Sequence, residues 1–298
     1  MASNFKRYYN IGGVAFSVET PVPFEDKEPY SLFSVGECQV DSEYVYSFCD
    51  TLPEPVGELL YEEANYRAYE AGENIVRYGG FFKDGRRLDP EYALTVYPKS
   101  GDMSRVSVTI PLDRDLPMKA AFIYRSLCIE HLLLRYRGII LHSSFVETDK
   151  GAILFTAPSG TGKSTQAELW RRCRDAFVVN GDCTYVRIKD GAVTANGLPF
   201  SGTSGICHNK SIPVRAIVYL TQAPENHIER LSGAGAFRVL YEGSKYDRWH
   251  DADASLGMDV ISDIVLKVPM FRLDCVPDES AVKILEDELL QTDCMGES

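Results

Sequence analysis

The sequence has 298 residues, 45% of them hydrophobic, which is enough for one large domain or two modest domains with a hydrophobic core. The formal net charge is -12 at pH 7, and an acidic surface repels phosphates, so we expect no nucleic-acid partner. Any anion-binding site must therefore build its positive potential locally. No apolar run approaches the ~18 residues that a bilayer span requires, and we expect no membrane partner either.

The number and spacing of the cysteines bear on the cellular compartment. The residues Met1–Arg7 lead into no apolar signal core, so nothing at this end predicts export. An even number of cysteines would also suit a disulfide framework, but without an export signal the better interpretation is reduced thiols in the cytoplasm. The eight cysteines show no Cys-x-x-Cys pair and no metal-finger spacing: Cys38, Cys49, Cys128, Cys173, Cys183, Cys207, Cys275 and Cys294.

The first third of the chain predicts a β-rich N-terminal domain, residues 1–111. Its β-branched and aromatic runs are bounded by residues typical of turns, and the first run holds a glycine turn or bulge. The links between the last three runs are rich in Gly, Pro and Asp, which favours an antiparallel meander. The predicted strands cover residues 9–18, 30–35, 74–78, 92–97 and 105–110.

From residue 112 to residue 298 the pattern changes to alternating helices and strands. Apolar residues recur at helical spacing over 118–137, and Gly138 is expected to end this helix. His131 lies within it, and packing is a better interpretation than metal binding. The remaining predicted strands are 139–146, a strand from 152, 176–179, 183–188, 192–195, 214–220 and 270–275, and the remaining predicted helices are 166–173, 235–241, 254–266 and 280–290. The sequence predicts a doubly wound or mixed α/β domain here.

A phosphate-binding loop follows the strand that ends at Thr156. Residues Gly162–Thr165 match the Gly-Lys-Ser/Thr signature, although Ala157 stands where the first glycine belongs. Glycines let backbone N–H groups turn toward a polyphosphate, and the following helix directs its positive end at the same charge. We expect the nucleotide to contact Ser159, Gly160, Thr161, Gly162, Lys163, Ser164 and Thr165.

Phosphoryl transfer also needs a metal ligand and a residue that aligns or deprotonates the acceptor. Lys163 is expected to reach the β- and γ-phosphates, and the Ser164 hydroxyl is placed to ligate Mg²⁺. Asp182 follows a buried strand, where a phosphate-loop protein holds Mg²⁺, so it is the candidate for the second or the third role. His142 also follows an apolar run, and its spacing suits a buried histidine and an active-site histidine equally well.

Two further features leave alternatives open. The segment 197–205 combines glycines and hydroxyl residues, and it suits a second anion-binding loop as well as a surface turn. Four basic side chains are candidates for charge stabilisation, and their positions in the sequence do not choose among them: Arg215, Arg238, Lys245 and Arg248.

The order and spacing of three segments resemble the C-terminal domain of HPr kinase/phosphorylase. These segments are Leu141–Ser143, Gly151–Ser164 and Val179–Asp182, within a resemblance that covers about residues 138–220. The loop is also similar to that of ATP-dependent phosphoenolpyruvate carboxykinase. The resemblance implies an α/β nucleotide-binding core of this type, ATP and Mg²⁺ as cofactors, and a homo-oligomer by analogy.

Carried over residue by residue, the resemblance implies that Lys163 contacts the phosphates and that Ser164 and Asp182 hold the metal. It places His142 near the transferred phosphoryl group, so Asp182, His142 and Lys163 are the catalytic candidates. The chain departs from the family at Gly181, which stands where the kinase has its first aspartate, assigned as general base. Either Asp182 takes that role, or His142 does, or the protein binds nucleotide without efficient transfer.

The sequence thus favours an ATP- and Mg²⁺-dependent kinase-like phosphotransferase. Its acceptor would be a hydroxyl, of serine type, on a small molecule, a peptide or a protein. The alternative is a nucleotide-binding regulatory or assembly protein that uses its N-terminal domain to dock a partner.

Overall fold

A computed structural model describes residues 4–80, 82–83, 86–87, 91–111, 123 and 125–296. By its contacts the chain divides into two compact units, an N-terminal unit of Met1–Arg135 with Asp247–Ala254, and a C-terminal unit of Tyr136–Tyr246 with Ser255–Ser298. The first unit extends beyond residue 111, where the sequence predicted the boundary between two domains. Compact units are not the same as domains, so the domain boundary stays a prediction. Both units contain a large mixed sheet.

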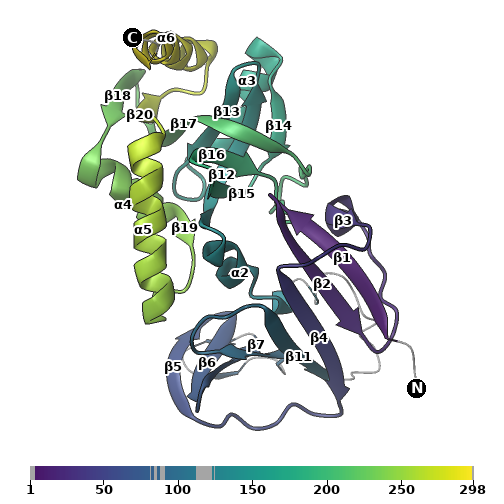
Figure 1. Cartoon of the computed structure of the whole chain (residues 1–298). Helices are drawn as coiled ribbons and strands as arrows, with labels where there is room; N and C mark the ends of the chain where they lie inside the picture. The colour runs from purple at the N-terminus through teal and green to yellow at the C-terminus, as the bar shows by residue number, and fades with distance from the viewer. Residues whose placement is uncertain are drawn as a thin grey trace. The chain divides into compact units, whose positions relative to one another are not determined.

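The N-terminal unit is built on one sheet with the strand order β3-β1-β2-β4-β11-β10-β7-β6-β5 (Figure 1). Its pairings are antiparallel except at β4, which runs parallel to both β2 and β11. Two short strands, β8 (Phe82–Lys83) and β9 (Arg86–Arg87), pair with each other. The strands of the large sheet are β1 (Phe5–Ile11), β2 (Val14–Thr20), β3 (Ser34–Val35), β4 (Ser42–Cys49), β5 (Glu58–Glu63), β6 (Tyr66–Ala71), β7 (Asn74–Gly79), β10 (Ala93–Pro98) and β11 (Arg105–Pro111).

The predicted meander is confirmed by the antiparallel pairings of β7 with β10 and of β10 with β11. The run 9–18 forms a hairpin that turns at two glycines. The predicted strand 30–35 is mostly wrong, because Tyr30–Phe33 forms a 3-10 helix (η1) and only β3 remains extended. The backbone N–H groups of Tyr30 and Ser31 both donate to the carbonyl of Lys27, which starts the helical turn.

The helix expected over 118–137 is shorter in the described part of the chain. Helix α2 spans Ile129–Arg135, while residues 118–122 and 124 lie outside the described residues. The left-handed residue that follows the helix is Arg137, with φ 60°. Gly138 therefore does not end the helix as expected, and it begins the next strand instead.

The C-terminal unit contains the remaining elements, and its predicted strands and helices are found with shifts of a few residues at their ends (Figure 1). Two short strands, β18 and β19, were not foreseen. The bounds are β12 (Gly138–Thr148), β13 (Gly151–Thr156), α3 (Lys163–Arg174), β14 (Phe177–Asn180), β15 (Cys183–Lys189), β16 (Ala192–Asn196), β17 (Ser211–Gln222), β18 (His227–Leu231), α4 (Gly233–Gly243), β19 (Ser244–Lys245), α5 (Asp251–Lys267), β20 (Met270–Cys275) and α6 (Glu279–Gly296).

The sheet of this unit is mixed and is not doubly wound. Its order is β13-β12-β15-β16-β17-β20-β18, and an additional pairing of β13 with β17 closes the first five strands on themselves. The β13–β17 and β17–β20 pairs are parallel. The other pairs of this sheet are antiparallel, and four of them involve β12, with β13, β14, β15 and β19. Of the two alternatives from the sequence, the structure therefore agrees with the mixed α/β sheet.

A buried core holds the phosphate-loop strand in place. Phe155 of β13 is fully buried, and Trp170 of α3 lies beside it with ring centroids 6.5 Å apart. Helix α3 also packs against α6, and Arg174 donates from Nε and Nη2 to the two carboxylate oxygens of Glu286, both at 2.8 Å. The loop between β13 and α3 therefore stands on two well-packed elements.

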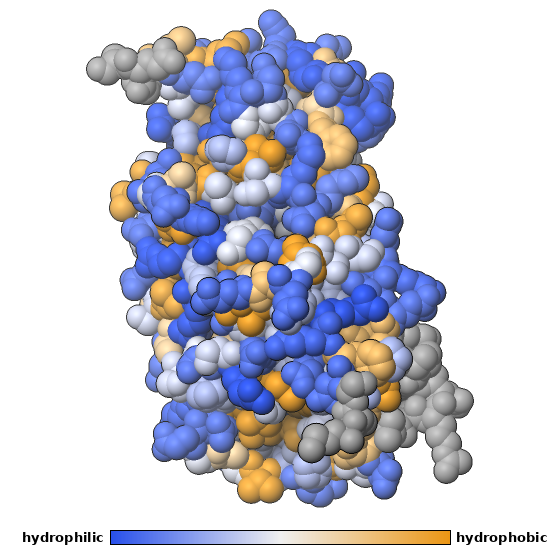
Figure 2. All heavy atoms as spheres, turned by 45° about the vertical axis from the view of Figure 1, so that its right-hand side comes forward, coloured by the Kyte–Doolittle hydropathy of each residue, from blue (hydrophilic) through white to orange (hydrophobic). Residues whose placement is uncertain are grey.

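Hydrophilic residues predominate on the face shown in Figure 2, with hydrophobic residues scattered among them. Scattered exposed apolar residues are normal for a folded chain and need no partner to explain them. No helix in the described part of the chain is both long and apolar enough to span a membrane.

Candidate functional site

The predicted phosphate loop lies between the end of β13 and the first residue of α3. Gly160 and Gly162 have φ values of +80° and +120°, which L side chains rarely adopt, and open space surrounds the position of a Cβ at both. Residues 158–160 are exposed. The backbone of the loop is thus accessible beside the N-terminus of a helix, an arrangement that suits an anion.

Lys163 folds back over this loop. Its ammonium donates to the carbonyl oxygens of Ala157, at 2.9 Å, and Pro158, at 3.2 Å, and the residue is 7% exposed. Burial lowers its pKa, the charge of Lys245 lowers it further, and Asp182 acts in the opposite direction. Lys163, which the sequence predicts to bind phosphate, is therefore a buried cation at the loop. Its present acceptors are neutral carbonyl oxygens, which an anion can replace.

His142 and Asp182 lie close together, which two side chains of one site must do. His142 Nε2, on β12, is 3.8 Å from Asp182 Oδ1, in the turn between β14 and β15. Burial lowers the pKa of His142, and the charges of Lys163 and Lys245 lower it further. Its imidazole is consequently neutral at neutral pH and can accept a proton.

The turn that carries Asp182 is fixed by a residue that the sequence analysis did not single out. Asn180 is fully buried, and its Oδ1 accepts hydrogen bonds from the backbone N–H groups of Asp182 and Cys183, at 2.9 and 3.1 Å. Its Nδ2 donates to the carbonyl oxygens of Leu198 and Phe200, at 3.0 and 2.9 Å. One side chain therefore joins the Asp182 turn to the segment 197–205.

The segment 197–205 lies directly against this turn. A Cβ at Gly202 would lie 2.7 Å from the carboxylate of Asp182, and a Cβ at Gly181 would lie 2.3 Å from the Oγ of Ser204. The Ser204 hydroxyl donates to the Ser201 carbonyl at 2.6 Å, which fixes its position. A side chain at position 181 would therefore collide with Ser204.

A cavity of about 330 Å³ opens beside the phosphate loop, which is near the lower end of the volumes of small-molecule sites. Lys245 of β19 lines it together with His142, Thr156 and Pro158. Because β19 pairs with β12 at Ile140 and Leu141, Lys245 is positioned by the same strand as His142. Of the four basic candidates, Lys245 is therefore the one that borders the site.

The other three basic candidates lie elsewhere. Arg215 donates to Asp293 at 2.7 Å, and Arg238 is 3.8 Å from Glu242 on the exposed surface of α4. Arg248 belongs to the N-terminal unit.

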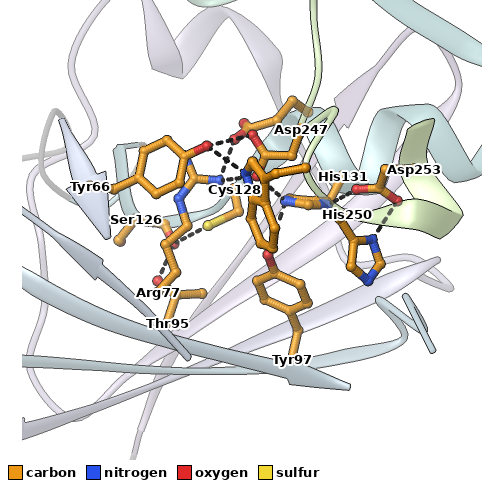
Figure 3. Close-up of polar contacts among 12 residues, drawn as sticks. Tyr66, Arg77, Thr95, Tyr97, Ser126, Cys128, His131, Asp247, His250 and Asp253 are labelled. Atoms are coloured by element: carbon orange, nitrogen blue, oxygen red, sulfur yellow. Dashed lines mark hydrogen bonds and ion pairs between the residues drawn. The ribbon is translucent and has the colours of Figure 1, made fainter. Parts of the chain in front are cut away.

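A second cluster of charged side chains lies in the N-terminal unit (Figure 3). His131 contacts Asp247 through Nε2 at 2.8 Å and Asp253 through Nδ1. The Nη1 of Arg77 donates to Glu130 at 2.7 Å and to Asp247 at 3.1 Å. The segment 247–254 is thereby bound to α2 and β7 by buried ion pairs.

Three residues of this cluster, Glu130, His131 and Asp247, have ligand atoms close enough to hold a metal ion. The donor set does not fit one, because Arg77 already pairs with both carboxylates and His131 is protonated. Burial opposes that proton, but hydrogen bonds to Asp247 and Asp253 outweigh the opposition and raise the pKa of His131 to about 9. The interpretation of His131 as a packed residue therefore agrees with its surroundings.

The comparisons with known proteins give one family. A model of the family described as "SynChlorMet cassette protein ScmC" matches residues 117–276, more than half of the chain. Among solved structures, "Structure of the Hpr(Ser) kinase/phosphatase from Coxiella burnetii" is similar with a TM-score of 0.32 and 12% identity, over 53% of this chain and 96% of that chain. No curated protein matches.

The role of Asn180 gives a first prediction. Asn180→Ala removes the acceptor of two buried N–H groups and the donor to two carbonyls, so we expect about 3 kcal/mol less stability for the C-terminal unit. In a Trp249→Phe background Trp170 is the only tryptophan, and its fluorescence during urea unfolding measures this loss. The exposed Gln291→Ala, on α6 of the same unit, is the control, with an expected change of ~0.5 kcal/mol or less. Equal losses in the two variants would contradict the role given to Asn180.

The ion pairs of His131 give a second prediction, on pH. The pKa of His131 is raised from 6.5 to about 9 on folding, so its stabilisation is complete below pH 6.5 and is lost as the pH rises through 9. We expect the N-terminal unit to lose about 2–3 kcal/mol between these values. Trp249 reports on this unit in a Trp170→Phe background. His131→Gln should flatten the pH dependence and His227→Gln should not, and a slope that survives His131→Gln would refute this origin.

Proposed function

The chain belongs to the family described as SynChlorMet cassette protein ScmC, and from the residues beside its phosphate loop we propose that it is an ATP- and Mg²⁺-dependent phosphotransferase. It would transfer the γ-phosphoryl group to a hydroxyl, of serine type, on a small molecule, a peptide or a protein. The observation that supports this most is the grouping of a buried ammonium, a carboxylate and a neutral imidazole beside the loop, in Lys163, Asp182 and His142.

The binding step rests on the loop and Lys163. The backbone N–H groups of 159–162 and the N-terminus of α3 would receive the phosphates, and the Lys163 ammonium would exchange its carbonyl acceptors for phosphate oxygens. Lys245 adds a second positive charge at the same place, while Glu242, which also lines the cavity, lies 3.8 Å from Arg238. The site thus concentrates positive charge where the net charge of -12 works against it.

Ser164 and Asp182 fit Mg²⁺ by the chemistry of their oxygens. Ser164 is exposed in the first turn of α3, and the Asp182 side chain is 31% exposed, so both can reach a ligand. Hydroxyl and carboxylate oxygens are hard donors of the kind that Mg²⁺ takes. When bound, the metal would neutralise charge on the β- and γ-oxygens.

In the transfer step the acceptor oxygen forms a bond to the γ-phosphorus, and the bond from that phosphorus to the bridging oxygen of ADP breaks. The acceptor proton must go to a base. His142 is neutral at neutral pH and Asp182 lies 3.8 Å from it, so either group can take the proton within this site.

The second candidate function is a nucleotide-binding regulatory or assembly protein without efficient transfer. One observation favours it, namely that Ser204 fills the space beside Gly181 where a further carboxylate would lie. Binding and transfer must therefore be measured separately.

Nucleotide binding depends on Lys163. Lys163→Ala removes a charge-assisted contact of about 1.5–3 kcal/mol, so ATP should bind roughly ten- to a hundred-fold more weakly in calorimetry. The exposed Lys189→Ala, in the same unit, should leave the affinity unchanged. Equal affinities for Lys163→Ala and the parent chain would reject the site.

Transfer depends on Asp182. With labelled ATP and a panel of serine-bearing small molecules and peptides, Asp182→Ala should lower transfer by at least about a hundred-fold while nucleotide binding is retained. His142→Gln, measured beside it across pH, shows whether the imidazole is the base, because only then does the inflection below pH 6.5 disappear. Tight binding by the parent chain without turnover on any acceptor would support the regulatory function instead.

A further inference from the structure

The N-terminal unit contains a cavity that the nucleotide site does not use. Its volume is about 340 Å³, within the range of small-molecule sites, and it lies among β6, β7, β10 and the segment 125–128. Two arginines, Arg77 and Arg125, line it, and the lining residues that the structure describes include no acidic side chain. The cavity therefore favours an anion over a cation or a neutral molecule.

Arg77 is held in a fixed orientation at the wall of this cavity (Figure 3). Its guanidinium carbon lies 3.6 Å from the centroid of the Tyr66 ring, and its Nη1 donates to both Glu130 and Asp247. These carboxylates contact one nitrogen only. The other edge, Nε and Nη2, makes no hydrogen bond to any residue within the described ranges, and two parallel N–H groups on one edge match a carboxylate.

The surrounding charges do not cancel the attraction for an anion. Arg77, His131 and Arg135 balance Glu130, Asp247 and Asp253 within the buried ion pairs. Arg125 is one positive charge beyond this balance. It is exposed and close enough to Tyr92, on the same cavity, to lower the pKa of that phenol against the larger effect of burial.

The floor of the cavity is already hydrogen-bonded, so it is formed without a ligand. The Thr95 hydroxyl donates to the Ser126 carbonyl at 2.7 Å, and the Ser126 hydroxyl donates to the Ile123 carbonyl at 2.7 Å. Cys128 is buried, and burial raises the pKa of its thiol to about 12, so it is no nucleophile at neutral pH. These groups shape a binding site and supply no reaction.

From this geometry we propose that the N-terminal unit binds a small organic carboxylate, with its carboxylate on the Nε–Nη2 edge of Arg77 and its body between Tyr66 and Tyr92. Arg125 supplies long-range attraction at the entrance. The site is separate from the phosphate loop and does not depend on the proposed phosphotransferase activity.

The test uses the full chain with ¹⁵N-labelled arginine and three probes of one shape, benzoate, benzamide and phenyl phosphate. Benzoate should shift the Nε–H resonance of Arg77 with saturation, whereas neutral benzamide should not. Arg125→Gln should weaken benzoate binding about three- to five-fold, as expected for an exposed charge. Arg105→Gln, an exposed arginine of the same unit, should leave it unchanged.

Several results would overturn the inference. A resonance of Arg77 that does not respond to benzoate with saturation, or that responds equally to benzamide, excludes a carboxylate site. Equal effects of Arg125→Gln and Arg105→Gln would mean that the cavity does not attract the probe. Tighter binding of phenyl phosphate than of benzoate would assign the site to phosphate esters instead. Arg77→Lys keeps the charge but loses the paired N–H groups, so benzoate affinity should fall in a variant whose Trp249 fluorescence matches the parent.

Discussion

The proposed phosphate site depends on one electrostatic constraint: an acidic chain can hold a polyphosphate only where its own positive groups are concentrated. Lys163 meets this constraint from a buried position, with its ammonium on two carbonyl oxygens of its own loop. Lys245 approaches the same place from β19. Burial lowers the pKa of His142 and these two charges lower it further, so they help to keep the neighbouring imidazole neutral and able to accept a proton.

The two units use buried charge differently. In the C-terminal unit, Asp182 and His142 remain partly exposed and 3.8 Å apart, and both can meet a ligand. In the N-terminal unit, His131 is satisfied on both ring nitrogens by Asp247 and Asp253, which leaves it no capacity for further chemistry. Buried, fully paired charges fix a structure, whereas half-paired charges at an accessible edge can act on a substrate.

Much of the candidate site could be predicted from the sequence, because the loop signature and the strands around it are local. The stretch from β13 to α3 lies where expected, and so does the hairpin of β15 and β16. Asn180 could not be found this way, because two of its four hydrogen bonds reach Leu198 and Phe200, which are distant along the chain. An Asn directly before Gly-Asp was the one local signal.

The sheet order and the ion pairs of the N-terminal unit could not be predicted either. Strand β4 begins with alternating buried and half-buried residues, a period-of-two pattern that its sequence could have indicated, whereas β5 is mostly exposed and has no such pattern. The parallel pairing of β4 with both β2 and β11 depends on tertiary contacts.

The most direct test of the central claim is a crystal structure of the chain with Mg²⁺ and a non-hydrolysable ATP analogue. We predict the triphosphate on the backbone of 158–162, with the Lys163 ammonium turned onto it; a nucleotide bound elsewhere, or an empty loop at saturating nucleotide, would contradict the account.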